Sequence, residues 1–279
     1  MSEILWLGDE RCDDVGLVGA KAANLSQLAE LQLVPPGYAL TAVQASKGLD
    51  GTLAEDVRRA YQELGARAGQ RNPRVAVRSS ALDEDSGGAS FAGQHDTYLN
   101  ITGEAAVVDA VERCCASALS STAMAYREQQ GLQTDAAAIA VLVQQLVHSE
   151  VSAVVFSANP ITLARDEIMI NASWGLGESV VSGTVTPDTY VIRKSDHSLI
   201  SRQISSKDVM TVMVEGGIEE VPVPADLKQQ PSLNASQVIE MARLVTKMED
   251  AMGWPADVEC AFAYDELYLL QCRPITTMI

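Results

Sequence analysis

The amino-acid sequence predicts an α+β protein. Strand-like and helix-like segments do not alternate strictly along the chain, as they would in a doubly wound sheet. The first half mixes both kinds, and the second half is mostly short β-rich runs interrupted by one long helical pattern. The length of 279 residues corresponds to about two domains.

In the first half, a helix is expected from Lys21 to about Leu31, because its apolar residues recur at helical spacing. Pro35 and Pro36 stop this helix. The other elements expected here are strands at residues 4–7 and 75–77 and helices at residues 53–64 and 104–119.

In the second half, β-rich runs broken by Gly, Pro or Asp predict strands. They cover residues 139–146, 151–156, 167–172, 189–192, 209–214 and 218–223. A helix is expected over about residues 235–252, and we interpret its Met and Val stripe as core. A hairpin of residues 257–264 and 267–274 completes the set.

Charge and targeting signals exclude several classes of function. The 37 acidic and 20 basic side chains give a formal net charge of −17, which argues against a general binder of nucleic acids or anionic membranes. The negative net charge does not exclude an anionic ligand at a local cationic site, since surface charges more than roughly 8 Å away are largely screened. We find no secretion signal and no membrane-spanning run, and the five cysteines lack a CxxC pair. We therefore expect a cytoplasmic protein with reduced thiols.

A first candidate site is the glycine-bearing segment that opens the first helix, Gly16 to Lys21. Small residues let a backbone approach a phosphate, and a helix N-terminus adds partial positive charge there. Lys21 would supply a point charge. The alternative is a glycine-rich helix cap with a solvated lysine.

A second candidate is Arg78, which follows an apolar strand and precedes an acidic, glycine-bearing loop. The arginine would give bidentate donors to a phosphate, and the loop would give backbone N–H groups. Phe91 is flanked by small residues and would be the tip of a lid that excludes water. The alternative is an acidic surface loop in which Arg78 pairs with Asp83 or Glu84.

A third candidate is the stretch Gln144 to Val147, which leaves a strand between the two halves. A connector between domains can offer backbone N–H and C=O groups to a flat heterocycle. The alternative is an ordinary strand end.

The fourth candidate is the C-terminal hairpin. Gln271 and Arg273 share a face of its second strand, and Glu259 joins them only if paired residue numbers sum to an even value. That parity requires an odd loop, for instance three residues with a bulge, instead of a two-residue turn on Asp265-Glu266. The other face would be apolar and would consist of Cys260, Phe262, Tyr264, Tyr268, Leu270 and Cys272.

Together, Glu259, Gln271 and Arg273 suit a metal-nucleotide site. Magnesium takes one or two protein oxygens and completes its octahedron with phosphate and water. The arginine would neutralise charge on a moving phosphoryl group. The alternative is an exposed polar face with a Glu259–Arg273 cross-strand pair.

The three histidines, His95, His148 and His197, lack the small-residue loop expected around a phosphorylated carrier. No Ser-His-Asp arrangement and no His/Cys metal spacing is visible. We interpret these histidines as solvated or satisfied by hydrogen bonds.

The order of these motifs resembles one family. Five blocks are similar to successive blocks of the nucleotide-binding domain of phosphoenolpyruvate synthase and pyruvate phosphate dikinase, most of all to the version in rifampicin phosphotransferases. The blocks are GLVGAKAANLSQLAELQLVPPGYALT, VAVRSSALDEDSGGASFAGQHDTYLNITG, VLVQQLVHSEVSAVVFSANPIT, NASWGLGESVVSGTVTPDTYVI and DVECAFAYDELYLLQCRPIT. The likeness covers the chain from Gly16 to Thr276.

The resemblance implies an ATP-grasp fold in which two lobes, here residues 1–146 and 147–279, clamp Mg-ATP. Lys21 and Arg78 would then bind phosphates, and Glu178 would lie near the nucleoside. Glu259 and Gln271 would hold Mg²⁺, and Arg273 would act on the transferred phosphate. The covering loop would consist of Ser90, Phe91, Ala92, Gly93 and Gln94, and the adenine-side hinge of Gln144, Gln145, Leu146 and Val147.

Members of this family split ATP into AMP and phosphate and place the β-phosphate on a histidine of a separate swivelling domain. That domain and the acceptor domain are absent from this sequence. The resemblance therefore implies an enzyme component that phosphorylates a histidine on a partner protein or separate domain, for onward transfer to pyruvate or a small acceptor. Two alternatives stay open: a non-catalytic nucleotide-binding regulatory subunit, and a stand-alone kinase or ligase that gives ADP.

Two residues depart from the family pattern. Thr122 stands where relatives commonly have an arginine, which would weaken a phosphate or interdomain contact. Cys260 stands where they have a tryptophan, which indicates repacking.

Overall fold

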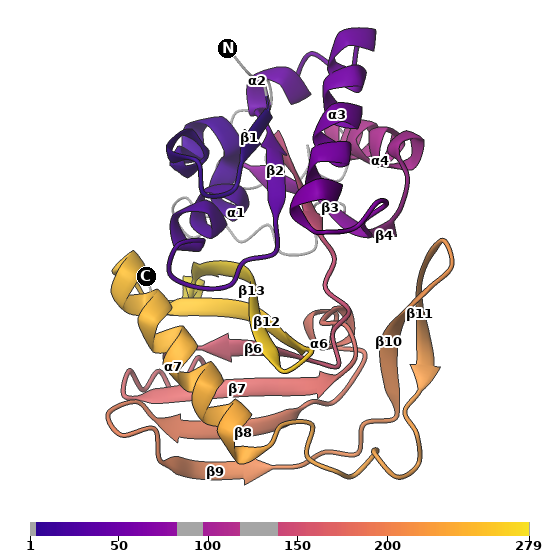
Figure 1. Ribbon diagram of the computed structural model, residues 1–279. Helices are drawn as coiled ribbons and strands as arrows, with labels where there is room; N and C mark the ends of the chain where they lie inside the picture. Colours follow the sequence, from indigo (N-terminus) through magenta and orange to yellow (C-terminus); the bar gives the residue numbers. More distant parts are fainter. Residues whose placement is uncertain (1–3, 83–96, 118–138, 279) are drawn as a thin grey trace. The chain divides into compact units, whose positions relative to one another are not determined.

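The computed structural model describes residues 4–82, 97–117 and 139–278 (Figure 1). The chain divides into two compact units. Unit 1 comprises Met1–Glu30 and Pro35–Leu146, and unit 2 comprises Leu31–Val34 and Val147–Ile279. The predicted covering loop, Ser90 to Gln94, and the departure at Thr122 lie outside the described residues.

Unit 1 is built on a five-stranded antiparallel sheet in the order β1-β2-β5-β3-β4. The strands are β1 (Ile4–Trp6), β2 (Gly37–Leu40), β3 (Val75–Ala81), β4 (Thr97–Ile101) and β5 (Ile139–Gln145). The helices are η1 (Glu10–Asp13), α1 (Val15–Leu28), α2 (Ala42–Ala45), α3 (Gly51–Arg67) and α4 (Glu104–Ser117).

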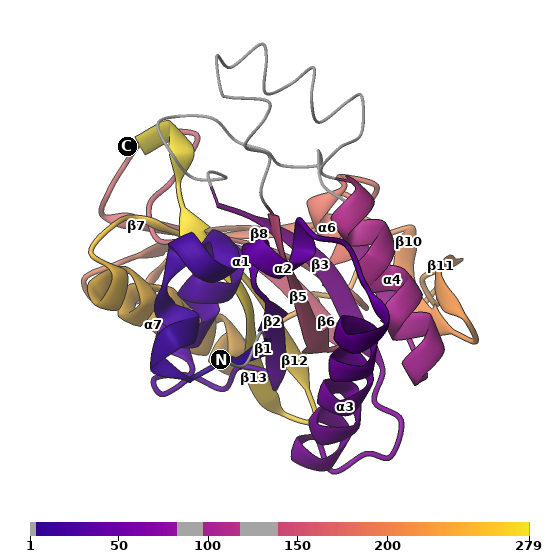
Figure 2. The same ribbon diagram turned by 90° about the horizontal axis from the view of Figure 1, so that it is seen from above.

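Helices cover both faces of this sheet (Figure 2). On one face, Val75 and Val77 of β3 join a core cluster with Tyr61 of α3 and Val111 of α4. The alternation of side chains along a strand places Arg78 and the buried Ser80 on the other face. Helix α1 packs on that second face, against β3 and β5.

Unit 2 is built on a six-stranded sheet in the order β13-β12-β6-β7-β8-β9, again antiparallel throughout. Its strands are β6 (Val151–Phe156), β7 (Glu167–Trp174), β8 (Asp188–Arg193), β9 (Leu199–Gln203), β12 (Ala256–Ala263) and β13 (Glu266–Pro274). A separate two-stranded hairpin consists of β10 (Val209–Val214) and β11 (Gly217–Pro222). The helices are α6 (Glu178–Val181), α7 (Ala235–Met252) and η2 (Thr276–Met278).

Helix α7 lies across one face of the six-stranded sheet (Figure 1). It begins with a capping box formed by Asn234 and Gln237 and ends at Gly253 in the left-handed conformation. Its buried Val and Met stripe, predicted to be core, includes Met241, Val245 and Met248, each fully buried. The opposite face of the sheet is the one that bears the polar residues described below.

The α+β class is confirmed, and the main differences concern short elements. Strands β2, β4 and β9 were not predicted, because β2 is entirely buried, β9 is entirely exposed and β4 shows no clear alternation, so none carries a period-two signal. Helix α1 begins at Val15 instead of Lys21, since the Asp14 side chain accepts a hydrogen bond from Gly16 N. The helix is interrupted at Gly19, whose φ is 73°.

Candidate functional site

The C-terminal hairpin places Glu259 directly opposite Gln271 on neighbouring strands. Directly paired residues of an antiparallel ladder point to the same face. Asp257 and Arg273 form the next pair on that face, two residues further along each strand. The pairing Glu259↔Gln271 therefore meets the even-sum condition derived from the sequence.

The even sum of the paired residue numbers has a different structural origin from the one that the sequence predicted. The loop is a two-residue turn of Tyr264 and Asp265, with φ of 53° and 62°, between the paired Ala263 and Glu266. A bulge then leaves Leu270 as the extra residue, because Cys260 pairs with Leu269 and Glu259 with Gln271. The predicted three-residue loop is thus wrong, and a bulge within the strand supplies the missing residue.

The bulge also corrects the predicted apolar face. Cys260, Phe262 and Cys272 are buried as expected, but Tyr264 is 77% exposed at the turn. On β13, the buried residues between turn and bulge are Leu267 and Leu269, and the predicted Tyr268 and Leu270 are only partly buried. One inserted residue switches every side chain on one side of it to the opposite face.

Arg273 pairs with Asp257, not with Glu259 as the alternative interpretation held. Its Nε donates to Asp257 Oδ2 at 2.9 Å, and the two side chains are 32% and 9% exposed. A carboxylate that accepts from Nε fixes the plane of the guanidinium. Sequence reasoning missed this orienting role of Asp257, although its position two residues before Glu259 was a signal for it.

The polar face continues across the sheet. Glu259 pairs with Val154, Val154 with Asn171, and Asn171 with Thr189, so all four point to one face. Thr189 Oγ1 donates to Asn171 Oδ1 at 3.0 Å, which directs the Asn171 amide group. Asn171 is a second residue that the sequence analysis did not single out, since only the strand order of the sheet brings it into the row with Glu259.

The donor set on this face fits a magnesium ion. Glu259 and Gln271 offer a carboxylate and an amide oxygen from directly opposed positions, which is the small number of protein oxygens that Mg²⁺ takes beside phosphate and water. Within the described residues, no group of three or more His, Cys, Asp or Glu side chains could hold a metal by itself. A metal here would therefore need oxygens from a ligand such as phosphate.

In unit 1, the helix turn that carries Lys21 lies against the end of the strand that carries Arg78. A Cβ built on Gly19 would meet Ser80 O at 2.4 Å, so only glycine permits this approach. Ala22 N donates to Ser80 Oγ at 3.4 Å, which ties the restarted helix to β3. Lys21 lies two residues after Gly19 and directly before Ala22, and Arg78 lies two residues before Ser80.

Most of the predicted hinge, Gln144 to Val147, is hydrogen-bonded to other residues of unit 1. The Gln144 side chain is buried and donates to Pro35 O at 3.2 Å. Gln145 N donates to Pro36 O at 2.9 Å, and Leu146 N donates to Arg74 O at 2.8 Å. Of this stretch, Val147 alone has a backbone N–H for which no partner exists among the described residues.

Glu178 is the first residue of α6, and the backbone just before it is firmly held. Leu176 N donates to Thr211 O of β10 at 2.9 Å, and Ser152 Oγ donates to Gly175 O at 2.8 Å. A Cβ on Gly175 would meet Thr211 O at 2.4 Å, so glycine is needed here as well.

Comparison with known families decides the relationship. The model of the pyruvate phosphate dikinase, AMP/ATP-binding domain matches residues 45–279. The chain belongs to this family. Its fold is accordingly the ATP-grasp fold expected from the resemblance, and its family is one of ATP-binding domains.

Curated relatives extend the likeness beyond the family match. Phosphoenolpyruvate synthase of Pyrococcus furiosus is 46% identical over 246 residues, which are 83% of this chain and 30% of that protein. Rifampicin phosphotransferase of Streptomyces sviceus is 35% identical over 303 residues, which are 95% of this chain and 35% of that protein. The chain thus spans about a third of the length of these relatives.

Among solved structures, D-alanyl-alanine synthetase A of Vibrio cholerae is similar at a TM-score of 0.36 and 13% identity, over 92% of this chain and 59% of that one. A similarity this low assigns neither a fold nor a function to this chain. In the part of the chain that the structure describes, no helix has the length and hydropathy needed to span a membrane.

Proposed function

We propose that this chain is the Mg-ATP-binding component of a phosphotransferase. It uses ATP to phosphorylate a histidine on a separate domain or partner protein, and the histidine passes the phosphate to pyruvate or a small acceptor. Family membership and the directly opposed Glu259 and Gln271, with Arg273 on the same face, support this proposal.

In the proposed reaction, a histidine ring nitrogen becomes bonded to the β-phosphorus, and the bond to the bridging oxygen of AMP breaks. Water supplies the oxygen that releases the γ-phosphate as inorganic phosphate. The products are therefore AMP, phosphate and phosphohistidine. Arg273, with its plane set by Asp257, would stabilise charge on the moving phosphoryl group.

Glu259 and Gln271 would hold a magnesium ion that neutralises the nucleotide phosphates when bound. In unit 1, Lys21 and Arg78 would bind phosphate oxygens, and the N–H of Val147 would donate to the adenine ring. Glu178 would lie at the nucleoside. The residues of this chain would thus bind and orient the nucleotide and its metal.

The decisive experiment is product analysis. The chain is incubated with Mg-ATP and the histidine domain of a related phosphotransferase, and nucleotides are separated by ion-exchange chromatography. AMP that forms only when the histidine domain is present supports the proposal. Mg-ATP binding without any transfer would contradict it and favour a regulatory subunit, and ADP would favour direct transfer to a small acceptor.

A matched pair of variants tests whether the hairpin binds the magnesium ion. Glu259→Gln should lose the Mg²⁺ dependence of ATP binding, since an amide is a much weaker ligand for a hard cation. Asp265→Asn removes a carboxylate from the exposed turn of the same hairpin and should leave binding unchanged. Equal behaviour of the two variants would contradict the metal assignment.

A further inference from the structure

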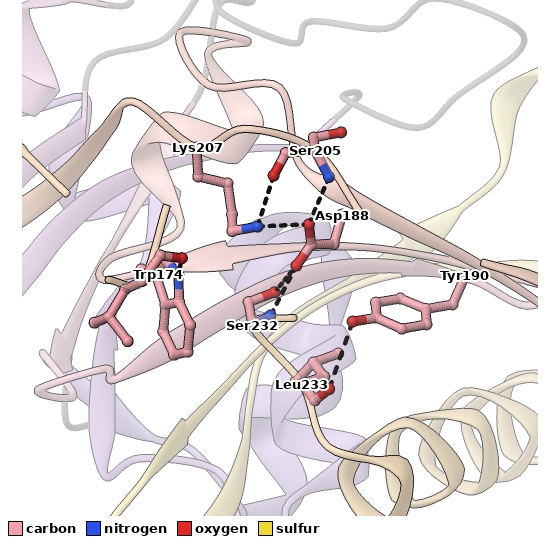
Figure 3. Close-up of polar contacts among 8 residues, drawn as sticks. Trp174, Asp188, Tyr190, Ser205, Lys207, Ser232 and Leu233 are labelled. Carbon is pink, nitrogen blue, oxygen red and sulfur yellow. Dashed lines mark hydrogen bonds and ion pairs between the residues drawn. The ribbon is translucent and has the colours of Figure 1, made fainter. Parts of the chain in front are cut away.

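Unit 2 contains a fully buried ion pair that takes no part in the proposed chemistry. Asp188, the first residue of β8, and Lys207, between β9 and β10, are both 0% exposed (Figure 3). Lys207 Nζ donates to Asp188 Oδ1 at 2.6 Å and to Ser205 O at 2.9 Å. The pair lies on the face of the sheet opposite to Glu259, because Asp188 neighbours Thr189 in the strand.

The carboxylate of Asp188 is fully engaged. Oδ1 also accepts from Ser205 N at 3.0 Å, and Oδ2 accepts from Ser232 N at 2.7 Å and Ser232 Oγ at 2.8 Å. One side chain thus joins three segments: the start of β8, the connection from β9 to β10, and the connection from β11 to α7 (Figure 3).

Stability alone does not explain such a pair. Taking two charges out of water costs several kcal/mol per ion, and a well-packed apolar pair is often as stable. A buried, hydrogen-bonded pair does impose a single arrangement on the segments that it joins, because any other arrangement leaves a charge unpaired. A part of the molecule next to the joined segments should therefore depend on that arrangement.

The segment that follows Lys207 is the β10–β11 hairpin. In the described part of the chain this hairpin belongs to no larger sheet, and a two-stranded hairpin by itself is marginally stable. Its base is closed by Lys207 N donating to Lys228 O at 2.9 Å and by Val223 N donating to Asp208 O at 3.0 Å. The buried pair therefore anchors the hairpin at its base.

The hairpin in turn holds the residues before Glu178. The carbonyl oxygen of Thr211 in β10 accepts from Leu176 N at 2.9 Å and lies only 2.4 Å from the place that a Cβ of Gly175 would take. Thr211 is the fourth residue after Lys207, and Glu178 is the second residue after Leu176. A displacement at the ion pair would thus reach Glu178 through one short strand.

We propose that the buried Asp188–Lys207 pair is a positioning element for the nucleotide site: it fixes the β10–β11 hairpin, and the hairpin fixes Glu178. The link to the nucleotide rests on the function proposed above. The link from the pair to Leu176 does not, and it can be measured without any nucleotide.

The first test is native-state hydrogen exchange of the wild-type chain in low denaturant. The amides of Ser205 and Ser232, which donate to Asp188, and the amide of Leu176 should open with one free energy and one denaturant dependence, as a single cooperative unit. Opening of Leu176 at a clearly lower free energy than the two serines would overturn the proposal, and this result needs no variant.

The second test compares two lysine variants. Lys207→Met leaves Asp188 buried without its counter-charge and should speed exchange of Leu176 N–H by about tenfold or more. Lys194→Met removes a half-buried pair with Glu249, 2.6 Å apart in the same unit, and should leave Leu176 unaffected. Equal exchange at Leu176 in both variants would overturn the proposal. If Lys207→Met does not fold, the wild-type exchange decides.

The third test separates positioning from general stability. Lys207→Met and Glu178→Gln should each weaken ATP binding, and the effect of Lys207→Met should shrink by about threefold or more when Glu178 is already replaced. Independent, multiplicative effects would show that Lys207 does not act through Glu178. A wild-type chain that binds no ATP would refute the proposed function and leave the exchange results valid.

Discussion

Two aspartates in strands of the six-stranded sheet, one on each face, pair with a basic side chain. Asp257–Arg273 and Asp188–Lys207 have similar distances, 2.9 Å and 2.6 Å. Their environments differ: Arg273 is 32% exposed beside Glu259 and Gln271, and Lys207 is completely buried. The distance within a pair therefore does not assign its role, because solvent access decides whether a charge can meet a ligand.

The largest expected effect is on stability at the buried pair. Lys207→Met should lower the free energy of unfolding by about 3–5 kcal/mol, since it leaves a buried carboxylate unpaired. Urea unfolding followed by circular dichroism measures this difference. Lys194→Met is the control and should lose about 1 kcal/mol or less. A loss below about 1 kcal/mol for Lys207→Met would remove the contrast between the two pairs.

A different balance is expected at the partly exposed pair. Arg273→Met should lower the unfolding free energy by about 1–3 kcal/mol, less than Lys207→Met, because solvent reaches the 32% exposed Arg273 while the 9% exposed Asp257 loses this partner. The same change should slow AMP formation by about 100-fold or more, as does removal of a donor aimed at developing charge. Single-turnover kinetics with the histidine domain gives the rate. A large stability loss with unchanged turnover would reverse the assignment of the two pairs.

Asn171 extends the polar face that bears Glu259 and Gln271, and its replacement tests how far the site reaches. Asn171→Leu should weaken Mg-ATP binding by about tenfold, the equivalent of roughly one hydrogen bond to a charged group. Isothermal titration measures the affinity. Thr189→Val removes the donor to Asn171 Oδ1 and should have a smaller effect in the same direction. An unchanged affinity in Asn171→Leu would limit the site to the hairpin.

The smallest effect concerns the buried thiol of Cys12. Burial raises the pKa of the Cys12 thiol from 9.0 to about 12. Because the folded-state pKa is the higher one, the thiol's contribution to stability is complete below pH 9, declines above it, and is lost by about pH 12. Cys12→Ala should therefore reduce the stability loss between about pH 8 and about pH 10 by about 1 kcal/mol. Urea unfolding at both pH values provides the measurement, and an unchanged pH dependence would contradict it.

Much of the hairpin was predictable from the sequence. The period-two pattern puts Gln271 and Arg273 on one face, and the need to bury the other face constrains Glu259 to join them. The position of the extra residue was not predictable, since a three-residue loop and a bulge at Leu270 satisfy the same parity. Only the backbone pairing distinguishes them.

The roles of Asp257 and Asn171 were predictable to different degrees. Asp257 lies two residues from Glu259 and so had to share its face. Asn171 lies 88 residues before Glu259 in the numbering, and its place in the row follows from the strand order β12-β6-β7. A local pattern fixes which face a side chain occupies, but the order of strands is a property of the whole sheet.

The sequence by itself determined the class of fold, the long helices, the family and the residue types at the candidate site, because each leaves a local pattern of spacing or motif. The tertiary structure decided which charges meet. Asp188 joins Lys207, 19 residues away, and Ser232, 44 residues away, through contacts that no periodicity encodes. Such pairs form where burial makes an unpaired charge too costly, and burial exists only once the chain has folded.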